Sequence, residues 1–357
     1  MSRSFLPLLL ALAACPPVVP GPTGSTDGTD GSDDTDGVET TFATLPQGAW
    51  SFVPVDGMIC ASGAATGIGV NPGSNPEKIA VMIQGGGACW DTNTCYVLKT
   101  AVQVESGFTE AQLAGAVAPL DAHPLYDRDA PDNPWADATF VFVPYCTADL
   151  HAGDAVGHYD PLKPDRELHH HGDANMAALA ERLRAELPDV DRAWFVGLSA
   201  GGYGVQLQAD RLVSIWPDAD SALLGDGSPM VQPYGGRWGE FERAWSLRRP
   251  AGCEDCETLP DILAGQVDAT DGSRLGLITT RSDGVITLYL NYPLGGLAGP
   301  VDRLAADVYA ADEDLDAFVV EGDQHVLIGE LGRKDTKDRV LGAWLDAWVS
   351  GEGWPPE

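Results

Sequence analysis

The segment Gly197-Leu198-Ser199-Ala200-Gly201 has the pattern GxSxG, and the residues on either side of it decide its interpretation. Residues 191–196 (DRAWFV) come directly before it and form an apolar run that predicts a buried strand. Residues 203–212 follow it and have the pattern of a helix. A strand, a sharp Gly-rich turn and a helix are typical of a turn that exposes a reactive serine. We therefore predict that Ser199 is a nucleophile, with an ordinary Gly-rich strand–helix turn as the alternative.

The chain from residue 42 onward alternates short apolar runs with helical segments. Val, Ile and Phe dominate the runs, which predicts strands buried on both faces, and residues 175–187 have helical spacing. This order predicts an α/β fold of the α/β-hydrolase type, in which helices cover both faces of a mostly parallel sheet. We expect residues 42–357 to form one catalytic domain. The other predicted strands are residues 78–83, 139–143, 221–224, 275–279 and 317–320, and a C-terminal helix is predicted over 340–349.

A serine hydroxyl is a poor nucleophile unless a base takes its proton, and in this fold the base is a histidine near the end of the chain. His325 is the only one of the seven histidines that follows Ser199. It stands in the loop after the predicted strand 317–320, where the catalytic histidine of such a fold is expected. We therefore predict that His325 is the general base.

The base needs a carboxylate to orient its ring. Asp283 follows the predicted strand 275–279 and stands at the usual place for this acid. Asp226 follows the strand after the predicted helix 203–212 and is the alternative acid. Asp323 is only two residues from His325, too local to orient the imidazole.

The tetrahedral intermediate of acyl transfer needs backbone N–H donors, which together form an oxyanion hole. One donor is expected from Ala200, the residue after the nucleophile. The others are expected from the loop Gly85-Gly86-Gly87-Ala88, which follows the predicted strand 78–83. A phosphate-binding loop is the competing interpretation, but no GK[ST] sequence follows these glycines.

The N-terminus has the pattern of an export signal. Arg3 precedes a short apolar stretch that ends in Leu12-Ala13-Ala14-Cys15, which resembles a bacterial lipobox. We expect residues 1–15 to be a lipoprotein signal peptide and Cys15 to be lipidated, with a plain secretory signal as the alternative. Residues 16–41 contain six acidic and no basic residues and are expected to be a disordered linker. The prediction is an exported cell-envelope lipoprotein, at the outer membrane or cell surface, or a secreted protein.

Charge and cysteine content narrow the possible partners. The net charge of −32 argues against nucleic-acid binding and disfavours a highly anionic polymer as substrate. Six cysteines remain after Cys15, an even number that suggests three disulfides in an exported protein. Cys253 and Cys256 form a single CxxC, which we interpret as a structural clip. We expect no metal site, and we interpret the run His169-His170-His171 as a solvated loop.

Several motifs together resemble the pectin acetylesterase and Notum family of carboxylesterases, over about residues 50–327. The resemblance rests on five segments: Gln84-Gly85-Gly86-Gly87-Ala88-Cys89-Trp90, residues 143–153 (VPYCTADLHAG), residues 197–202, Asp226-Gly227-Ser228 and Gly322-Asp323-Gln324-His325. Three positions depart from the common family pattern, namely Ala88, Ala148 and Asp226-Gly227-Ser228. These departures concern the lining of the pocket and leave the substrate open.

The resemblance implies a Ser-Asp-His triad at Ser199, Asp283 and His325, and oxyanion donors at Gly86, Gly87 and Ala200. It also implies three disulfides, which are Cys89–Cys95, Cys60–Cys146 and Cys253–Cys256. The expected activity is hydrolysis of a carboxylic ester through an acyl-enzyme without a cofactor, most simply deacetylation of a polysaccharide. A lipid or acyl-protein esterase, a peptidase and a non-catalytic glycan-binding lipoprotein are the alternatives.

Overall fold

A computed structural model describes residues 40–357 apart from 122, 131–132, 271, 352–353 and 355–357. The predicted signal peptide, Cys15 and nearly all of the predicted linker lie outside the described residues. Residues 40–357 form one compact unit.

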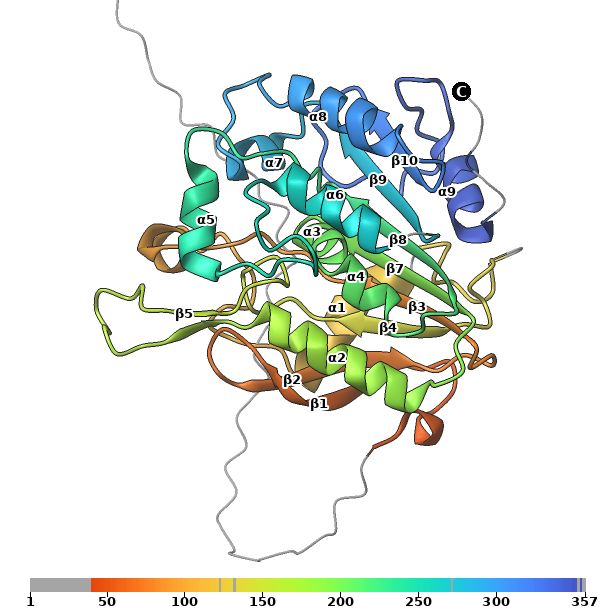
Figure 1. Cartoon of the computed structure of the whole chain (residues 1–357). Coiled ribbons are helices and arrows are strands. Elements are labelled where there is room, and N and C mark those ends of the chain that lie inside the picture. The colour runs from red at the N-terminus through yellow and green to blue at the C-terminus, as the bar shows by residue number, and fades with distance from the viewer. Residues whose placement is uncertain (1–39, 122, 131–132, 271, 352–353, 355–357) are drawn as a thin grey trace, which may run out of the picture. The chain divides into compact units, whose positions relative to one another are not determined.

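An eight-stranded sheet runs through this unit in the order β1-β2-β4-β3-β7-β8-β9-β10 (Figure 1). The strands from β4 to β10 pair in parallel, whereas β2 pairs antiparallel with both β1 and β4. The strands are β1 (Ser51–Ile59), β2 (Ala65–Asn71), β3 (Lys78–Ile83), β4 (Thr139–Val143), β7 (Arg192–Leu198), β8 (Asp220–Asp226), β9 (Arg274–Thr280) and β10 (Leu315–Val320). A separate hairpin pairs β5 (Ala155–Gly157) with β6 (Leu168–His170).

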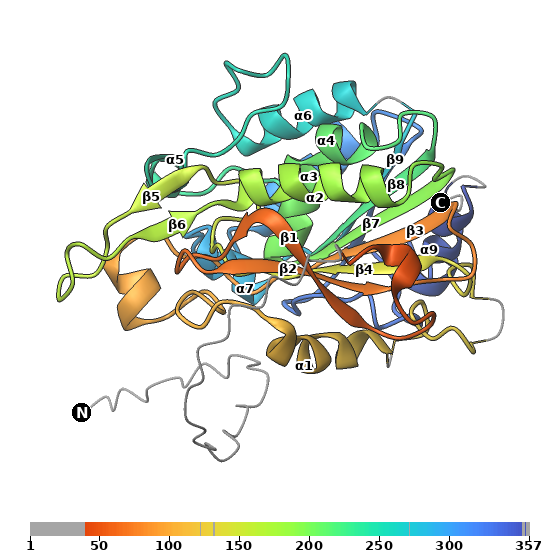
Figure 2. The same cartoon turned by 90° about the horizontal axis from the view of Figure 1, so that it is seen from below.

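Helices cover both faces of the sheet, as the sequence predicts, and the α/β-hydrolase fold class is confirmed. Successive side chains of β3 enter two different apolar clusters: Ile79, Val81 and Ile83 face one cluster, while Ala80 and Met82 face the other. Figure 2 shows α1 and α9 on one side of the sheet and α2, α3, α4 and α6 on the other. The helices are α1 (Glu110–Asp121), α2 (Gly172–Glu186), α3 (Ala200–Leu207), α4 (Ala209–Val213), α5 (Arg237–Trp245), α6 (Leu259–Ala269), α7 (Gly284–Tyr289), α8 (Ala298–Leu304) and α9 (Leu341–Ser350), with shorter turns η1 (Phe42–Thr44), η2 (Asn93–Val97) and η3 (Ala305–Tyr309).

Three disulfides stabilise the loops around the sheet, and their pairs are those that the resemblance implies. Cys60 directly follows β1 and pairs with Cys146, which lies shortly after β4. Cys89 pairs with Cys95 in the segment after β3, and Cys253 pairs with Cys256 between α5 and α6.

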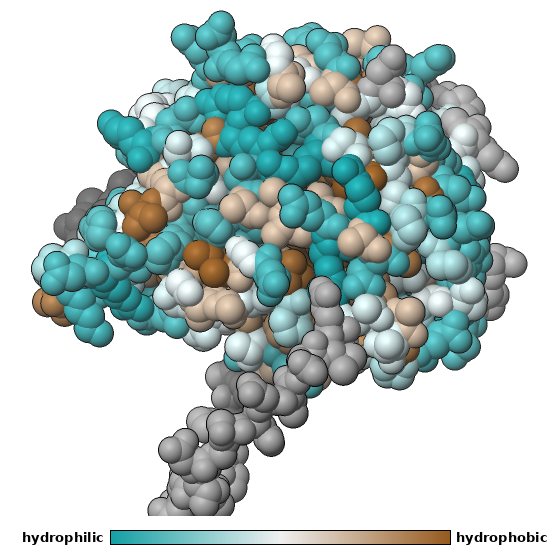
Figure 3. Space-filling model, turned by 60° about the horizontal axis from the view of Figure 1, so that its bottom comes forward, coloured by the Kyte–Doolittle hydropathy of each residue, from teal (hydrophilic) through white to brown (hydrophobic). Residues whose placement is uncertain are grey.

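The surface in Figure 3 is mostly hydrophilic, and its apolar side chains form small separate patches. In the part of the chain that the structure describes, no helix combines the length and apolarity needed to cross a bilayer.

Candidate active site

Ser199 occupies a strained turn between β7 and α3. Its φ of 55° and ψ of −120° lie outside the regions that non-glycine residues prefer. The turn requires small neighbours: a Cβ on Gly197 would lie 2.1 Å from the Gly201 carbonyl oxygen, and one on Gly201 would lie 2.0 Å from the Ile83 carbonyl oxygen. The predicted strand, turn and helix are therefore present. The first turn of α3 also leaves backbone N–H groups such as that of Ala200 without an intrahelical acceptor.

His325 and Asp283 meet through a hydrogen bond of 2.7 Å between Nδ1 of the imidazole and Oδ2 of the carboxylate. Asp283 is fully buried and is the N-cap residue of α7. Its other oxygen, Oδ1, accepts hydrogen bonds from the amides of Val285 at 2.9 Å and Ile286 at 3.0 Å. Both carboxylate oxygens thus have partners, which fixes the orientation of the acid and through it that of the imidazole.

Asp226, the alternative acid, has no hydrogen bond to the imidazole. Its Oδ2 accepts hydrogen bonds from the amides of Leu327 and Ile328, each at 2.7 Å. Burial raises the pKa of this carboxyl to about 7, against the lowering effect of the two amides. Asp323, the third carboxylate considered, contributes its backbone oxygen, which accepts from the Gly284 amide at 2.9 Å.

Ser199 and His325, the predicted nucleophile and base, both border the segment Asp226–Gly227. The Ser199 amide donates to the Asp226 carbonyl oxygen at 2.7 Å, and the His325 ring packs against Gly227. Among the hydrogen bonds of the described residues there is none between the Ser199 hydroxyl and His325. Nucleophile–base contacts commonly shorten when substrate binds.

The Gly-rich loop after β3 packs directly on the strained turn at Ser199 between β7 and α3, which we call the elbow. A Cβ on Gly85 would lie 2.1 Å from the Leu198 carbonyl oxygen, so only glycine allows this approach. Gly86 and Gly87 have φ values of 154° and 79°, and the Gly86 carbonyl oxygen accepts from the Val102 amide at 2.9 Å. The loop and the elbow are therefore in contact, as an oxyanion hole requires.

A buried histidine supports the start of this loop. His151 Nε2 lies 2.8 Å from the Gln84 carbonyl oxygen, and burial lowers the pKa of this imidazole to about 4. The neutral ring therefore donates its Nε2–H to that carbonyl. In the sequence, His151 stands out only as part of a motif, because a hydrogen bond to a distant backbone oxygen has no sequence signal.

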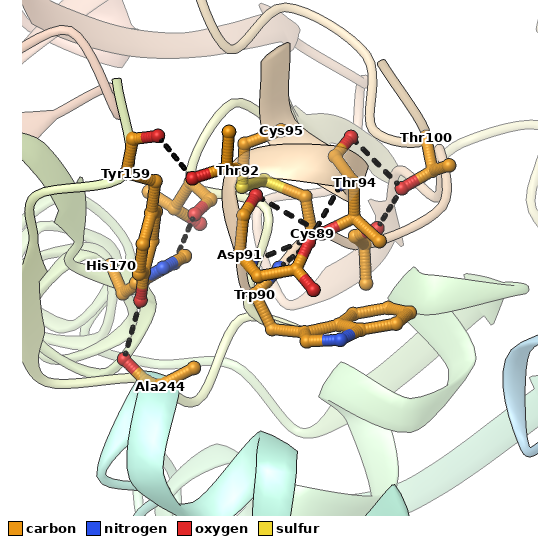
Figure 4. Close-up of a disulfide and its surroundings, with 12 residues drawn as sticks. Cys89, Trp90, Asp91, Thr92, Thr94, Cys95, Thr100, Tyr159, His170 and Ala244 are labelled. Atoms are coloured by element: carbon orange, nitrogen blue, oxygen red, sulfur yellow. Dashed lines mark hydrogen bonds between the residues drawn. A yellow bond between two sulfur atoms is a disulfide. The ribbon is translucent and has the colours of Figure 1, made fainter. Parts of the chain in front are cut away.

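The Cys89–Cys95 disulfide holds the other end of the loop (Figure 4). The Thr100 hydroxyl donates to the Ala88 carbonyl oxygen at 2.7 Å, and the Thr94 hydroxyl accepts from the Trp90 amide at 2.9 Å. These bonds and the disulfide fix residues 88–100 as a unit beside the glycines.

A small apolar pocket of about 30 Å³ lies beside Ser199. Helix α5 supplies Phe241 and Trp245, whose rings stack with centroids 4.5 Å apart. Trp245 Nε1 donates to the Cys89 carbonyl oxygen at 2.8 Å, which ties α5 to the loop after β3. The lining residues are Gly87, Ala88, Leu150, Ser199, Ala200, Tyr203, Phe241, Trp245, Leu259, Ile286, Tyr289 and Leu290. Most of them were not foreseen, because they come from helices whose packing no local pattern predicts.

The expectation of a solvated loop at His169-His170-His171 is wrong, because His169 and His170 belong to β6 and His171 is the N-cap residue of α2. His170 ends β6 and is fully buried, with its ring near Tyr159 and Trp245. Its Nδ1 lies 3.1 Å from the Thr147 carbonyl oxygen, and burial lowers its pKa to about 4. No group of three or more His, Cys, Asp or Glu side chains suited to a metal ion occurs within the described residues.

Comparison with known proteins gives two kinds of similarity. The family model for pectinacetylesterase matches residues 51–226. Palmitoleoyl-protein carboxylesterase NOTUM from Schmidtea mediterranea is 27% identical over 161 residues, and that from Drosophila melanogaster is 30% identical over 165 residues. The resemblance to the pectinacetylesterase and Notum family is confirmed.

The aligned region is a larger share of this chain than of the two Notum relatives. Each alignment covers 43% of this chain, but only 28% of the Schmidtea relative and 22% of the Drosophila relative. The fold extends further: two crystal forms of the Wnt deacylase Notum from Drosophila superpose with TM-scores of 0.59 and 0.60 at 16% and 17% identity. These superpositions cover 85% of this chain and 93% and 94% of the Notum chains, so the similarity of fold includes the C-terminal half.

Proposed function

We propose that this protein is a serine carboxylesterase that uses Ser199, His325 and Asp283 as its catalytic triad. The observation that carries the proposal is the 2.7 Å bond between His325 and a buried, fully hydrogen-bonded Asp283, beside a serine on a strained elbow. Ser199 attacks the ester carbonyl, and His325 takes the hydroxyl proton and returns it to the leaving alcohol. Asp283 holds the ring and stabilises its charged form. Water then releases the acyl group by the same route.

The amides of Gly86, Gly87 and Ala200 are the proposed oxyanion donors. Each such donor commonly stabilises the transition state by about 3–4 kcal/mol. The support for these positions is the contact between the Gly-rich loop and the elbow, together with the family resemblance. No metal or organic cofactor enters this scheme.

The acyl group in this proposal is acetyl. A pocket of about 30 Å³ has room for a methyl group and little else, since one water molecule needs ~10–15 Å³ by the same kind of measure. The Notum relatives are named for a palmitoleoyl group, and a long chain needs a far larger cavity. The stacked Phe241 and Trp245 line this pocket, and the pocket that they help to enclose is small.

The alcohol in this proposal is a neutral polysaccharide, and the enzyme acts outside the cytoplasm. The net charge of −32 disfavours a polyanionic chain. Three disulfides are typical of exported proteins. Anchorage of the chain through a lipid on Cys15 would place the enzyme at the cell envelope.

The test is hydrolysis of p-nitrophenyl acetate, butyrate and palmitate by the full chain and by Ser199→Ala. Ser214→Ala is the matched control, because Ser214 follows α4 and its hydroxyl donates to the nearby Arg211 carbonyl oxygen. Loss of a triad nucleophile commonly lowers turnover by ~10⁶. We expect wild type and Ser214→Ala to prefer acetate and Ser199→Ala to match the blank. If folded wild type does not exceed the blank from pH 5 to 9, the glycan-binding alternative replaces the esterase.

A further inference from the structure

Asp226 contacts both the segment that carries Ser199 and the segment that carries His325. It is the last residue of β8, the strand next to the one that leads into Ser199, and it is fully buried. Its backbone oxygen accepts the Ser199 amide at 2.7 Å. The nucleophile is therefore tied to Asp226 through the main chain.

The side chain of Asp226 holds the segment that carries the base. Oδ2 accepts the amides of both Leu327 and Ile328 at 2.7 Å, two and three residues after His325. An ionised carboxylate makes such bonds about twice as strong as neutral ones. Oδ1 is buried and has no hydrogen-bond partner among the described residues. The protein thus keeps a buried carboxyl here whose only side-chain hydrogen bonds are to the histidine segment.

The histidine segment needs such support because it is strained. Val326, between the base and the two bonded amides, has a φ of 62°, a region that β-branched residues avoid. Gly227, the residue after Asp226, packs against the His325 ring. It has a φ of 68°, and a Cβ there would lie 2.9 Å from His325 Cε1. Residues 226–227 therefore fix both the course of the loop and the place of the ring.

We propose that Asp226 is the positioning residue of this site, and that its ionised carboxylate holds His325 in register with Ser199. The inference rests on the proposed esterase function, because it concerns the same triad. Asp226 does not touch the reacting atoms in this scheme; it acts through the amides of Leu327 and Ile328 and through its charge.

The charged groups that face Asp226 are His325 and Asp283. The negative charge of Asp226 favours the imidazolium that forms when His325 takes the serine proton. Protonation of Asp226 removes this charge and weakens both amide bonds. Because burial raises the pKa of Asp226 to about 7, this protonation takes place in the pH range in which esterases are assayed. Activity should therefore require the loss of a proton from Asp226 on its acid limb, in addition to the neutral base that the proposed mechanism needs.

The experiment compares wild type, Asp226→Asn and Asp220→Asn as full chains with p-nitrophenyl acetate from pH 5 to 9. Asp220 begins the same strand and is paired with Arg192 and Arg274, so its variant is the matched control. We expect Asp226→Asn to lower kcat about 10- to 100-fold with KM within about twofold, the size of effect that a small misplacement produces. The acid limb of log kcat/KM should have a slope near two in wild type and Asp220→Asn, and near one in Asp226→Asn.

Two results overturn the inference: an Asp226→Asn variant with the wild-type kcat and slope, or a wild-type acid limb with a slope of one. The second result decides the matter even if Asp226→Asn does not fold. Ser199→Ala, assayed in parallel, separates the two proposals. If it is inactive, an unchanged Asp226→Asn refutes the positioning role alone; if it is active, the esterase proposal falls, and the positioning role falls with it.

Discussion

The buried carboxyl of Asp226 should make the stability of the protein fall as the pH rises. Burial raises its pKa from 3.8 to about 7, so the folded state holds this proton more tightly than the unfolded chain does. The resulting stability is fully present below pH 4 and is lost as the pH rises through about 7. This difference between the pKa of Asp226 in the folded and the unfolded chain corresponds to about 4 kcal/mol of unfolding free energy.

Asp226→Asn removes this dependence while keeping the shape of the side chain. The ordinary pKa of 3.8 and the raised pKa of about 7 place about 2–3 kcal/mol of this total between pH 5 and pH 8.5. We therefore expect the unfolding free energy of the variant, minus that of wild type, to increase by about this amount over the range. The buried amide NH₂ adds a cost, because Oδ1 has no hydrogen-bond partner among the described residues, but that cost does not vary with pH.

Guanidinium denaturation at pH 5, 6.5 and 8.5, with the disulfides oxidised, measures this difference. Asp220→Asn is the control: burial opposes ionisation there, but hydrogen bonds from Arg274 and Arg192 outweigh it and lower the pKa of Asp220. That control should give a difference that is flat above pH 5. A difference for Asp226→Asn that is equally flat, within about 0.5 kcal/mol, would refute the reasoning, since a shift of this size must produce a slope.

Three further predictions concern other parts of the site and fold. Asp283→Asn should lower kcat on p-nitrophenyl acetate by ~10⁴ with little change in KM, because the imidazole loses its orienting carboxylate; a loss below tenfold contradicts this role. Trp245→Ala should raise the ratio of butyrate to acetate kcat/KM about tenfold or more and cost ~3–5 kcal/mol of stability by chemical denaturation; an unchanged ratio would show that α5 does not limit the acyl group. Cys60→Ala with Cys146→Ala opens a loop of 86 residues and should cost ~4–5 kcal/mol in the same assay; a cost below about 1 kcal/mol would contradict it.

The central strands could be predicted from sequence because each is a continuous apolar run. Residues 78–83 and 139–143 match the bounds of β3 and β4, and the strand before Ser199 is only slightly displaced from β7. The strands β1 and β2 were not predicted. The sequence of β1 (Ser51–Ile59) contains a proline and a glycine, and its residues alternate in burial, so it has no continuous apolar run. Its pairing with β2 is also not visible within the segment itself.

The residues of the site also differ in how far the sequence predicts them. Order along the chain was enough to select Ser199, Asp283 and His325 as candidates, and the structure joins the last two by a hydrogen bond. The roles of Asp226 and of the α5 aromatic side chains depend on contacts between distant segments. A carboxylate that binds backbone amides 101 and 102 residues away has no sequence pattern. The prediction for His170 was wrong for a related reason. Its ring is buried near Tyr159 and Trp245, and the sequence around His170 does not indicate these contacts.

The tie between Trp245 and Cys89 has an evolutionary consequence. Phe241 and Trp245, which form part of the pocket wall, come from α5 in the connection between β8 and β9, whereas the proposed nucleophile, acid and base stand after β7, β9 and β10. Under the proposed function, substitution of Phe241 would therefore change which acyl group fits without altering the proposed triad, whereas Trp245 also holds the loop after β3. In the proposed esterase, this separation would let related lineages, or a directed-evolution library confined to residues 237–244, explore new acyl groups on an unchanged triad.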